Sequence, residues 1–193
     1  MSLILGILDS GGAAAGGGTA YESIASATGT GSSGTITFSS IPATYSHLQI
    51  RILGRNLYSA GSSARSLWFT FNSDTSNSYP VHRLYGDGSA ASAEGFTATG
   101  SGGTSFLGWA MVDSGATASV YATTIMDIHD YASTSKYKTV RSISGADLNG
   151  SGRIYLNSSV WMSTSAITSI TFEDQAGGGF STGTTFALYG IKG

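Results

Sequence analysis

Two glycine-rich segments have the spacing of known catalytic or nucleotide-binding motifs. Residues 29–34 match G-x-G-x-x-G, in which glycines let a helix N-terminus approach a pyrophosphate. Residues 179–183 match G-x-S-x-G, in which Ser181 would be a nucleophile. Both motifs require a helix directly afterwards, whereas a strand-like segment follows each of them here. The sequence therefore predicts neither dinucleotide binding nor hydrolase chemistry, and we expect no catalytic residues.

Metal-ligating residues are few and dispersed. The three histidines, His47, His82 and His129, are far apart in sequence, so a metal site would require the fold to gather them. Residues 127–130 form the densest polar group. Residues 147–151 carry oxygen-bearing side chains at alternate positions, as a calcium loop does, but the distal bidentate glutamate is missing. We expect no metal and no other cofactor.

Carboxylates and tryptophans are the remaining candidates for chemistry or binding. The carboxylates are Asp87, Glu94, Asp113, Glu173 and Asp174. Glycoside hydrolysis would need two of them at a set separation, which a sequence does not give. Trp68, Trp109 and Trp161 are candidates for sugar stacking or for a subunit interface, with core packing as the alternative.

The elements that would position these residues are β-strands. Apolar and polar residues alternate with period two in several segments, so that one face of each can pack while the other meets water or a second layer. These segments are 35–38, 47–52, 120–129, 153–162, 170–172 and 186–188. Turn residues separate them, and no stretch has the pattern of a capped amphipathic helix. We expect an all-β fold over residues 19–193, a single antiparallel β-sandwich of jelly-roll type.

Composition narrows the class of protein. Charged residues make up 10% of the 193 residues, against about 25% in ordinary soluble domains. The 9 Lys and Arg are scattered and the net charge is −2, which argues against nucleic-acid binding. The chain has no cysteine, and no apolar run approaches the ~20 residues of a membrane span.

The N-terminal residues differ from the rest. An apolar peptide over residues 3–8 is followed by a Gly/Ala-rich linker, and it lacks the basic region of a secretory signal. We expect residues 1–18 to be an extended attachment segment and residues 19–193 to be the domain; alternatively, residues 3–8 are the first strand of that domain. The predicted docking residues are Leu3, Ile4, Leu5, Ile7 and Leu8.

Several segments resemble a widespread family of tailed-bacteriophage virion proteins. The resemblance rests on residues 21–25, 36–51, 71–74, 131–141 and 186–193, including the pattern TFSSIPATYSHLQIR … FALYGIKG. Their order and spacing are similar over residues 20–193, and many such proteins also begin with a short apolar peptide and a small-residue linker. The family comprises virion structural, tail-associated or decoration proteins, usually without known activity, so the resemblance implies no enzyme.

The expected function follows from these points. We expect a structural protein on the surface of a phage particle, associated with the tail or baseplate as a fibre-like or tip component and docked by its N-terminal peptide onto other virion proteins. A homo-oligomer is expected, and a trimer would fit. The alternatives are a capsid decoration protein and a module that binds host-surface glycans.

Overall fold

The computed structural model describes residues 20–193 except 60–63, 77, 98–104 and 176. No helix among these residues is long and apolar enough to cross a membrane. The described residues form twelve strands: β1 (Tyr21–Thr28), β2 (Thr35–Phe38), β3 (His47–Gly54), β4 (Ala64–Phe71), β5 (Pro80–Gly86), β6 (Ala91–Thr97), β7 (Ser105–Val112), β8 (Ala122–His129), β9 (Lys138–Asp147), β10 (Gly152–Trp161), β11 (Ile170–Asp174) and β12 (Thr185–Ile191).

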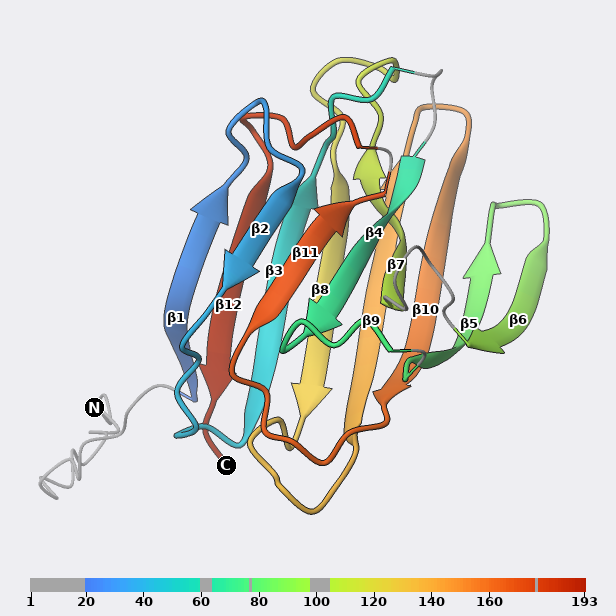
Figure 1. Ribbon diagram of the computed structural model, residues 1–193. Helices are drawn as coiled ribbons and strands as arrows, with labels where there is room; N and C mark the ends of the chain where they lie inside the picture. The colour runs from blue at the N-terminus through green and yellow to red at the C-terminus, as the bar shows by residue number, and fades with distance from the viewer. Residues whose placement is uncertain (1–19, 60–63, 77, 98–104, 176) are drawn as a thin grey trace, which may run out of the picture.

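The strands form two antiparallel sheets packed face to face, as Figure 1 shows. The larger sheet has the order β1-β12-β3-β8-β9-β10-β5-β6, and the smaller has the order β2-β11-β4-β7. Eight of the strands make the two four-stranded sheets of a jelly roll, β1-β12-β3-β8 and β2-β11-β4-β7. The predicted all-β, jelly-roll-like sandwich is confirmed.

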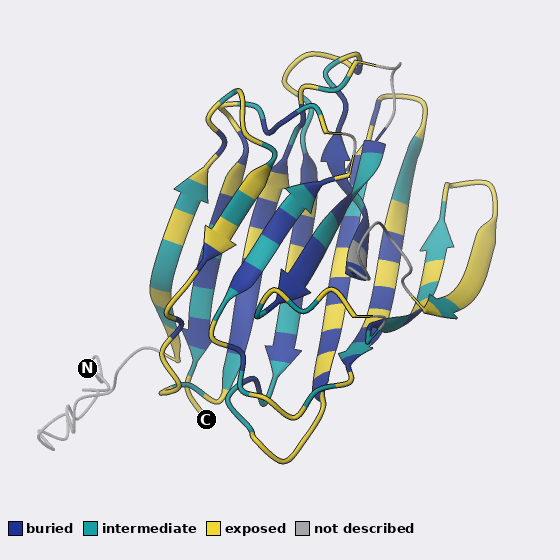
Figure 2. Cartoon of the chain, in the orientation of Figure 1, coloured by how far each residue is buried: buried dark blue, intermediate teal, exposed yellow. Residues whose placement is uncertain are grey.

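Two hairpins are inserted into this jelly roll, and both extend the larger sheet. The β9–β10 hairpin lies between β8 and β11 in the chain, and β9 pairs with β8. The β5–β6 hairpin lies between β4 and β7 in the chain, and β5 pairs with β10. At the outer edge, β6 is exposed along most of its length (Figure 2). The two hairpins therefore contribute four of the eight strands of the larger sheet.

The main core lies between the two sheets. Leu48, Ile50 and Ile52 of β3 point into it, as the alternation predicts. From the opposite sheet, Phe172 lies 5.3 Å from the ring of Phe186, and such offset aromatic pairs add to the free energy of burial. This core is continuous over both sheets, which is what one sandwich domain requires.

One inner strip of the extension is polar instead of apolar. Ser142, Ser144 and Asn157 are buried beneath β7. The Ser144 hydroxyl donates to the carbonyl of Gly108 in β7, and Asn157 Nδ2 lies 3.0 Å from Ser142 Oγ. In β10 the inner face thus combines polar Asn157 and Ser159 with the rings of Tyr155 and Trp161, and Ile154 lies on the outer face. The alternation in residues 153–162 is observed, with its apolar side outermost.

The described chain begins and ends at the same end of the larger sheet. Tyr21 of β1 pairs with Ile191 of β12, and the Lys192 N–H donates to the Ala20 carbonyl at 3.0 Å. Lys192 also forms an ion pair with Glu22. The predicted attachment segment, residues 1–18, lies outside the described residues, so its docking role and the alternative of an additional strand both stay predictions.

Candidate interaction surface

The outer face of the larger sheet carries a row of apolar side chains across adjacent strands. Leu84, Leu156, Ile143 and Ile125 are direct neighbours in register on β5, β10, β9 and β8. Their exposed fractions are 52%, 54%, 46% and 41%. We call these four residues the ridge. A row of this kind in the described part of the chain is an exposed apolar patch, which typically marks an interaction site.

A hollow of about 780 Å³ lies on one side of the ridge. It exists because Ile154 lies between two glycines in register, Gly86 on β5 and Gly145 on β9, which bring no side chains to the surface. Ile125 and Ile143 line the same hollow. Its walls are therefore largely aliphatic, and its floor is partly backbone.

A second hollow, of about 680 Å³, lies on the other side of the ridge. Gly95 of β6 lies opposite His82 of β5 there, and the imidazole of His82 lies over Gly95. Leu84 and Leu156 border it from the ridge, and Arg141 lines it as well. The ridge is thus a raised apolar strip between two hollows.

The rest of the outer face, on β1, β12 and β3, is largely polar, although Leu53 of β3 is exposed there. The Arg51 guanidinium lies over the rings of Tyr21 and Tyr189, at 5.9 and 5.2 Å from their centroids. Arg51 Nε donates to Gln49 Oε1, and Gln49 Nε2 donates to Asp127 Oδ1. These polar groups are therefore hydrogen-bonded or stacked on one another. The outer face thus has a polar half on these strands and an apolar half that contains the ridge.

On the opposite face of β5 and β10 the chain gathers arginines and aromatic rings. Tyr85 and Tyr155 stack with centroids 5.1 Å apart. The Arg153 guanidinium lies 5.6 Å from the Tyr85 centroid and 5.1 Å from that of Trp109, and Arg83 lies 5.2 Å from that of Tyr155. We call these five residues the cation–π cluster. Rings and guanidinium groups of this kind are the side chains that stack on sugars and bind anionic groups.

The predicted tryptophans separate into three environments. Trp161 is 2% exposed, and its indole N–H donates to Asp74 Oδ2 at 2.6 Å, so it is a core residue. Trp68 is partly exposed on the outer side of the smaller sheet, opposite Glu173 in register. Trp109 belongs to the cation–π cluster, and it alone among the three lies with other candidate binding groups.

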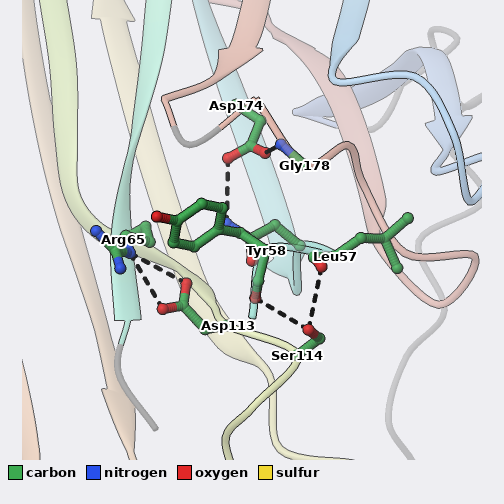
Figure 3. A network of polar contacts seen from close by, with 8 residues as sticks. Leu57, Tyr58, Arg65, Asp113, Ser114, Asp174 and Gly178 are labelled. Atoms are coloured by element: carbon green, nitrogen blue, oxygen red, sulfur yellow. Dashed lines mark hydrogen bonds and ion pairs between the residues drawn. The ribbon is translucent and has the colours of Figure 1, made fainter. Parts of the chain in front are cut away.

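Two buried carboxylates have structural partners (Figure 3). Asp113 is fully buried and forms an ion pair with Arg65, whose Nε lies 3.1 Å from Asp113 Oδ2. The next residue, Ser114, donates its hydroxyl to the carbonyls of Leu57 and Tyr58. These contacts fix the segment after β3 to the loop after β7. Asp113 itself is held by Arg65 of β4, which is not the arrangement of a free acid or base.

Asp174 makes the second of these cross-links. Its Oδ1 accepts from Asn56 Nδ2 at 3.1 Å, and its Oδ2 accepts from the backbone N–H groups of Gly178 and Gly179 at 2.9 and 3.1 Å. Glu94 is the ion-pair partner of Arg83, at 2.5 Å. The contacts of these carboxylates give no support to a glycosidase pair.

The two glycine motifs lie against each other. The Gly29 N–H donates to the Thr184 carbonyl at 2.9 Å, and the Gly31 N–H donates to the Phe180 carbonyl at 3.0 Å. A Cβ at Gly29 would lie 2.1 Å from the Ser181 carbonyl oxygen, so glycine is required for this close approach. The next elements are the strands β2 and β12, as the sequence predicts. The motifs act as paired loops that close one end of the sandwich.

The histidines and the calcium-like segment provide no metal cage. His47 and His129 are opposite each other in register, with ring centroids 4.9 Å apart, and His47 Nδ1 accepts the backbone N–H of Asp130. Asp147 Oδ1 accepts the Asn149 N–H, which stabilises the β9–β10 turn. Within the described ranges, no group of three or more His, Cys, Asp or Glu residues is placed to hold a metal ion.

Sequence reasoning missed the ridge and the cation–π cluster. The signal for the ridge was present in Ile154 and Leu156, but the side of β10 that faces outward depends on what covers the other side.

Comparison with protein-family models, with curated proteins and with solved structures gives no match.

Proposed function

We propose that this protein is a non-enzymatic structural subunit of a tailed-phage particle, located at the tail or baseplate and attached through residues 1–18. The observation that carries the structural role is the ridge with its two hollows, because an apolar sheet face of this kind is typical of a subunit that packs against another protein. Jelly-roll domains occur in viral shells and in lectins, although a fold alone does not define a function.

The assignment to a phage particle is supported by the resemblance in residues 36–51 and 186–193. The proposed attachment through residues 1–18 is supported by composition, since an apolar peptide on a flexible linker suits docking into a groove or onto a sheet edge. Residue 20 lies beside β12 at one end of the larger sheet, so such a peptide would extend from that end.

Immunogold labelling of intact particles with an antibody against residues 20–193 tests the location. We expect gold at the distal tail. Gold over the head would replace the tail assignment with capsid decoration. An absence of gold and of peptides by mass spectrometry of purified particles, with the protein present in infected-cell lysate, would contradict the structural role.

The attachment peptide needs a separate test. A chain with Leu5→Asp is expected to lose binding to particles stripped of this protein, because the substitution places a charge within the apolar peptide. The matched control is Ser10→Asp, which adds the same charge in the linker and is expected to bind normally. Unchanged binding of Leu5→Asp would show that residues 3–8 are not the docking element.

A glycan-binding role is the second candidate, and the cation–π cluster favours it. Tyr85, Trp109 and Arg153 are only partly buried, and rings beside a guanidinium group are suited to an acidic saccharide. A glycan array should then give a binder that Trp109→Ala weakens and Trp68→Ala does not. An array without any binder at millimolar ligand would remove this candidate.

A further inference from the structure

We propose that the ridge binds a second copy of this chain, so that the outer faces of two larger sheets pack together about a two-fold axis parallel to the ridge. Such a dimer lies beyond the particle role, because its partner is already present in a solution of the pure protein. It can therefore be tested without any particle.

The outer face is self-complementary in shape. The ridge stands between two hollows of about 780 and 680 Å³, so the ridge of one copy can enter a hollow of the other. A two-fold axis makes each contact occur twice, with the same patch used by both copies. Strands of the two copies then run within about 30° of each other, as in aligned sheet packing.

The charge of the outer face also permits two copies to meet. In the described strands, the charged side chains that share the outer face are Arg51, Asp127, Arg141 and Asp147. Two are basic and two are acidic, so the face is formally neutral and two copies do not repel each other. On β9, Arg141 and Asp147 lie on opposite sides of Ile143. An axis parallel to the ridge places the acidic side of one copy over the basic side of the other.

The area of the outer face is sufficient for an interface. Eight strands about 4.8 Å apart, with about eight residues of about 3.3 Å each, present a face of roughly 1,000 Å². A standard protein interface takes about 800 Å² from each partner. The sheet is thus large enough for a stable dimer, and the apolar half supplies the buried centre that such an interface needs.

Sedimentation equilibrium of the full chain tests the proposal. We expect twice the mass of one chain for the native protein, and a dissociation constant raised at least tenfold by Leu156→Lys. The matched control is Leu57→Lys, because Leu57 is also exposed, at 39%, and lies outside the ridge. Unaltered circular dichroism of the Leu156 variant will show that the fold is kept.

Three outcomes would overturn the proposal: a monomeric native chain, a dimer indifferent to Leu156→Lys, or a dimer lost on deletion of residues 1–18. The last result would assign the apolar face to the N-terminal peptide instead. A monomer in solution together with gold on particles would reject the dimer and leave the particle role standing. A dimer in solution without gold on particles would support the dimer and reject the particle role.

Discussion

Asn56 donates its side-chain amide to Asp174 Oδ1 at 3.1 Å, joining residues 118 positions apart in the chain. Asn56 follows β3 of the larger sheet, and Asp174 ends β11 of the smaller one. The same carboxylate accepts two backbone N–H groups from the turn at Gly178. One buried side chain thus connects the two sheets and a loop.

Asp174→Ala should therefore lower the free energy of unfolding by about 3 kcal/mol, because it leaves several buried donors without their acceptor. Urea denaturation measures the change. Glu173→Ala is the control, since its side chain is only partly buried, and a change within about 0.5 kcal/mol is expected there. Equal losses for the two variants would contradict the role given to Asp174.

Gly54 is expected to reject any side chain. A Cβ at this position would lie 2.1 Å from the Ala110 carbonyl oxygen, where β3 passes β7, and this contact is with backbone. Gly54→Ala should destabilise the domain by about 3 kcal/mol, at the upper end of overpacking effects. In the control Gly86→Ala, the nearest atom is 3.6 Å away, which is an ordinary contact. Thermal unfolding that is equally tolerant of both would refute the close approach.

Trp161→Phe should cost about 2–3 kcal/mol, because it removes ring volume from the core and leaves Asp74 Oδ2 without its indole donor. Chemical denaturation gives the free energy, and loss of the most blue-shifted tryptophan emission identifies the buried ring. Trp68→Phe, on the outer side of the smaller sheet, is expected to change stability by less than about 1 kcal/mol. The reverse order would be inconsistent with these placements.

Asp87 should titrate well below an ordinary aspartate. The Ala90 N–H, the Ser89 hydroxyl and the Ser89 N–H donate to Asp87 Oδ1, and these bonds lower the pKa of Asp87 from 3.8 to about 2. The lowered pKa means that the carboxylate stabilises the β5–β6 turn fully above about pH 4 and loses this effect as the pH falls through 2.

An NMR titration of the Asp87 carboxyl carbon measures this pKa directly. The protection factors of the β5 and β6 amides against hydrogen exchange should fall over the same pH range in the native chain, and Asp87→Ala should remove that fall. A titration midpoint near 3.8 would mean that the turn bonds do not persist in solution.

Strand positions were predictable for six of the twelve described strands, β2, β3, β8, β10, β11 and β12, because period-two alternation depends only on local sequence. Leu48, Ile50 and Ile52 alternate clearly and lie in the core as predicted. The edge strand β6 escaped prediction, because its Ala, Ser and Gly residues carry no apolar alternation. Its structure comes from hydrogen bonds to β5, which a local pattern does not record.

The direction in which β10 faces was not predictable from the sequence. Its inner residue Asn157 is polar, and it can be buried because Ser142 of the neighbouring strand is its hydrogen-bond partner. Alternation gives two faces and assigns the apolar one inward by default. In β10, Asn157 lies inside because Ser142 on the neighbouring strand is its hydrogen-bond partner. The ridge is therefore seen only in the three-dimensional structure.

The pairing of the two inserted hairpins makes one of them depend on the other. The β9–β10 hairpin needs only β8 of the jelly roll as its neighbour, whereas β5–β6 pairs with the larger sheet only through β10. Removal of β9–β10 would therefore leave β5–β6 without its neighbour in the larger sheet, whereas removal of β5–β6 would leave β9–β10 paired with β8. A chain without either hairpin would lack three of the four ridge residues.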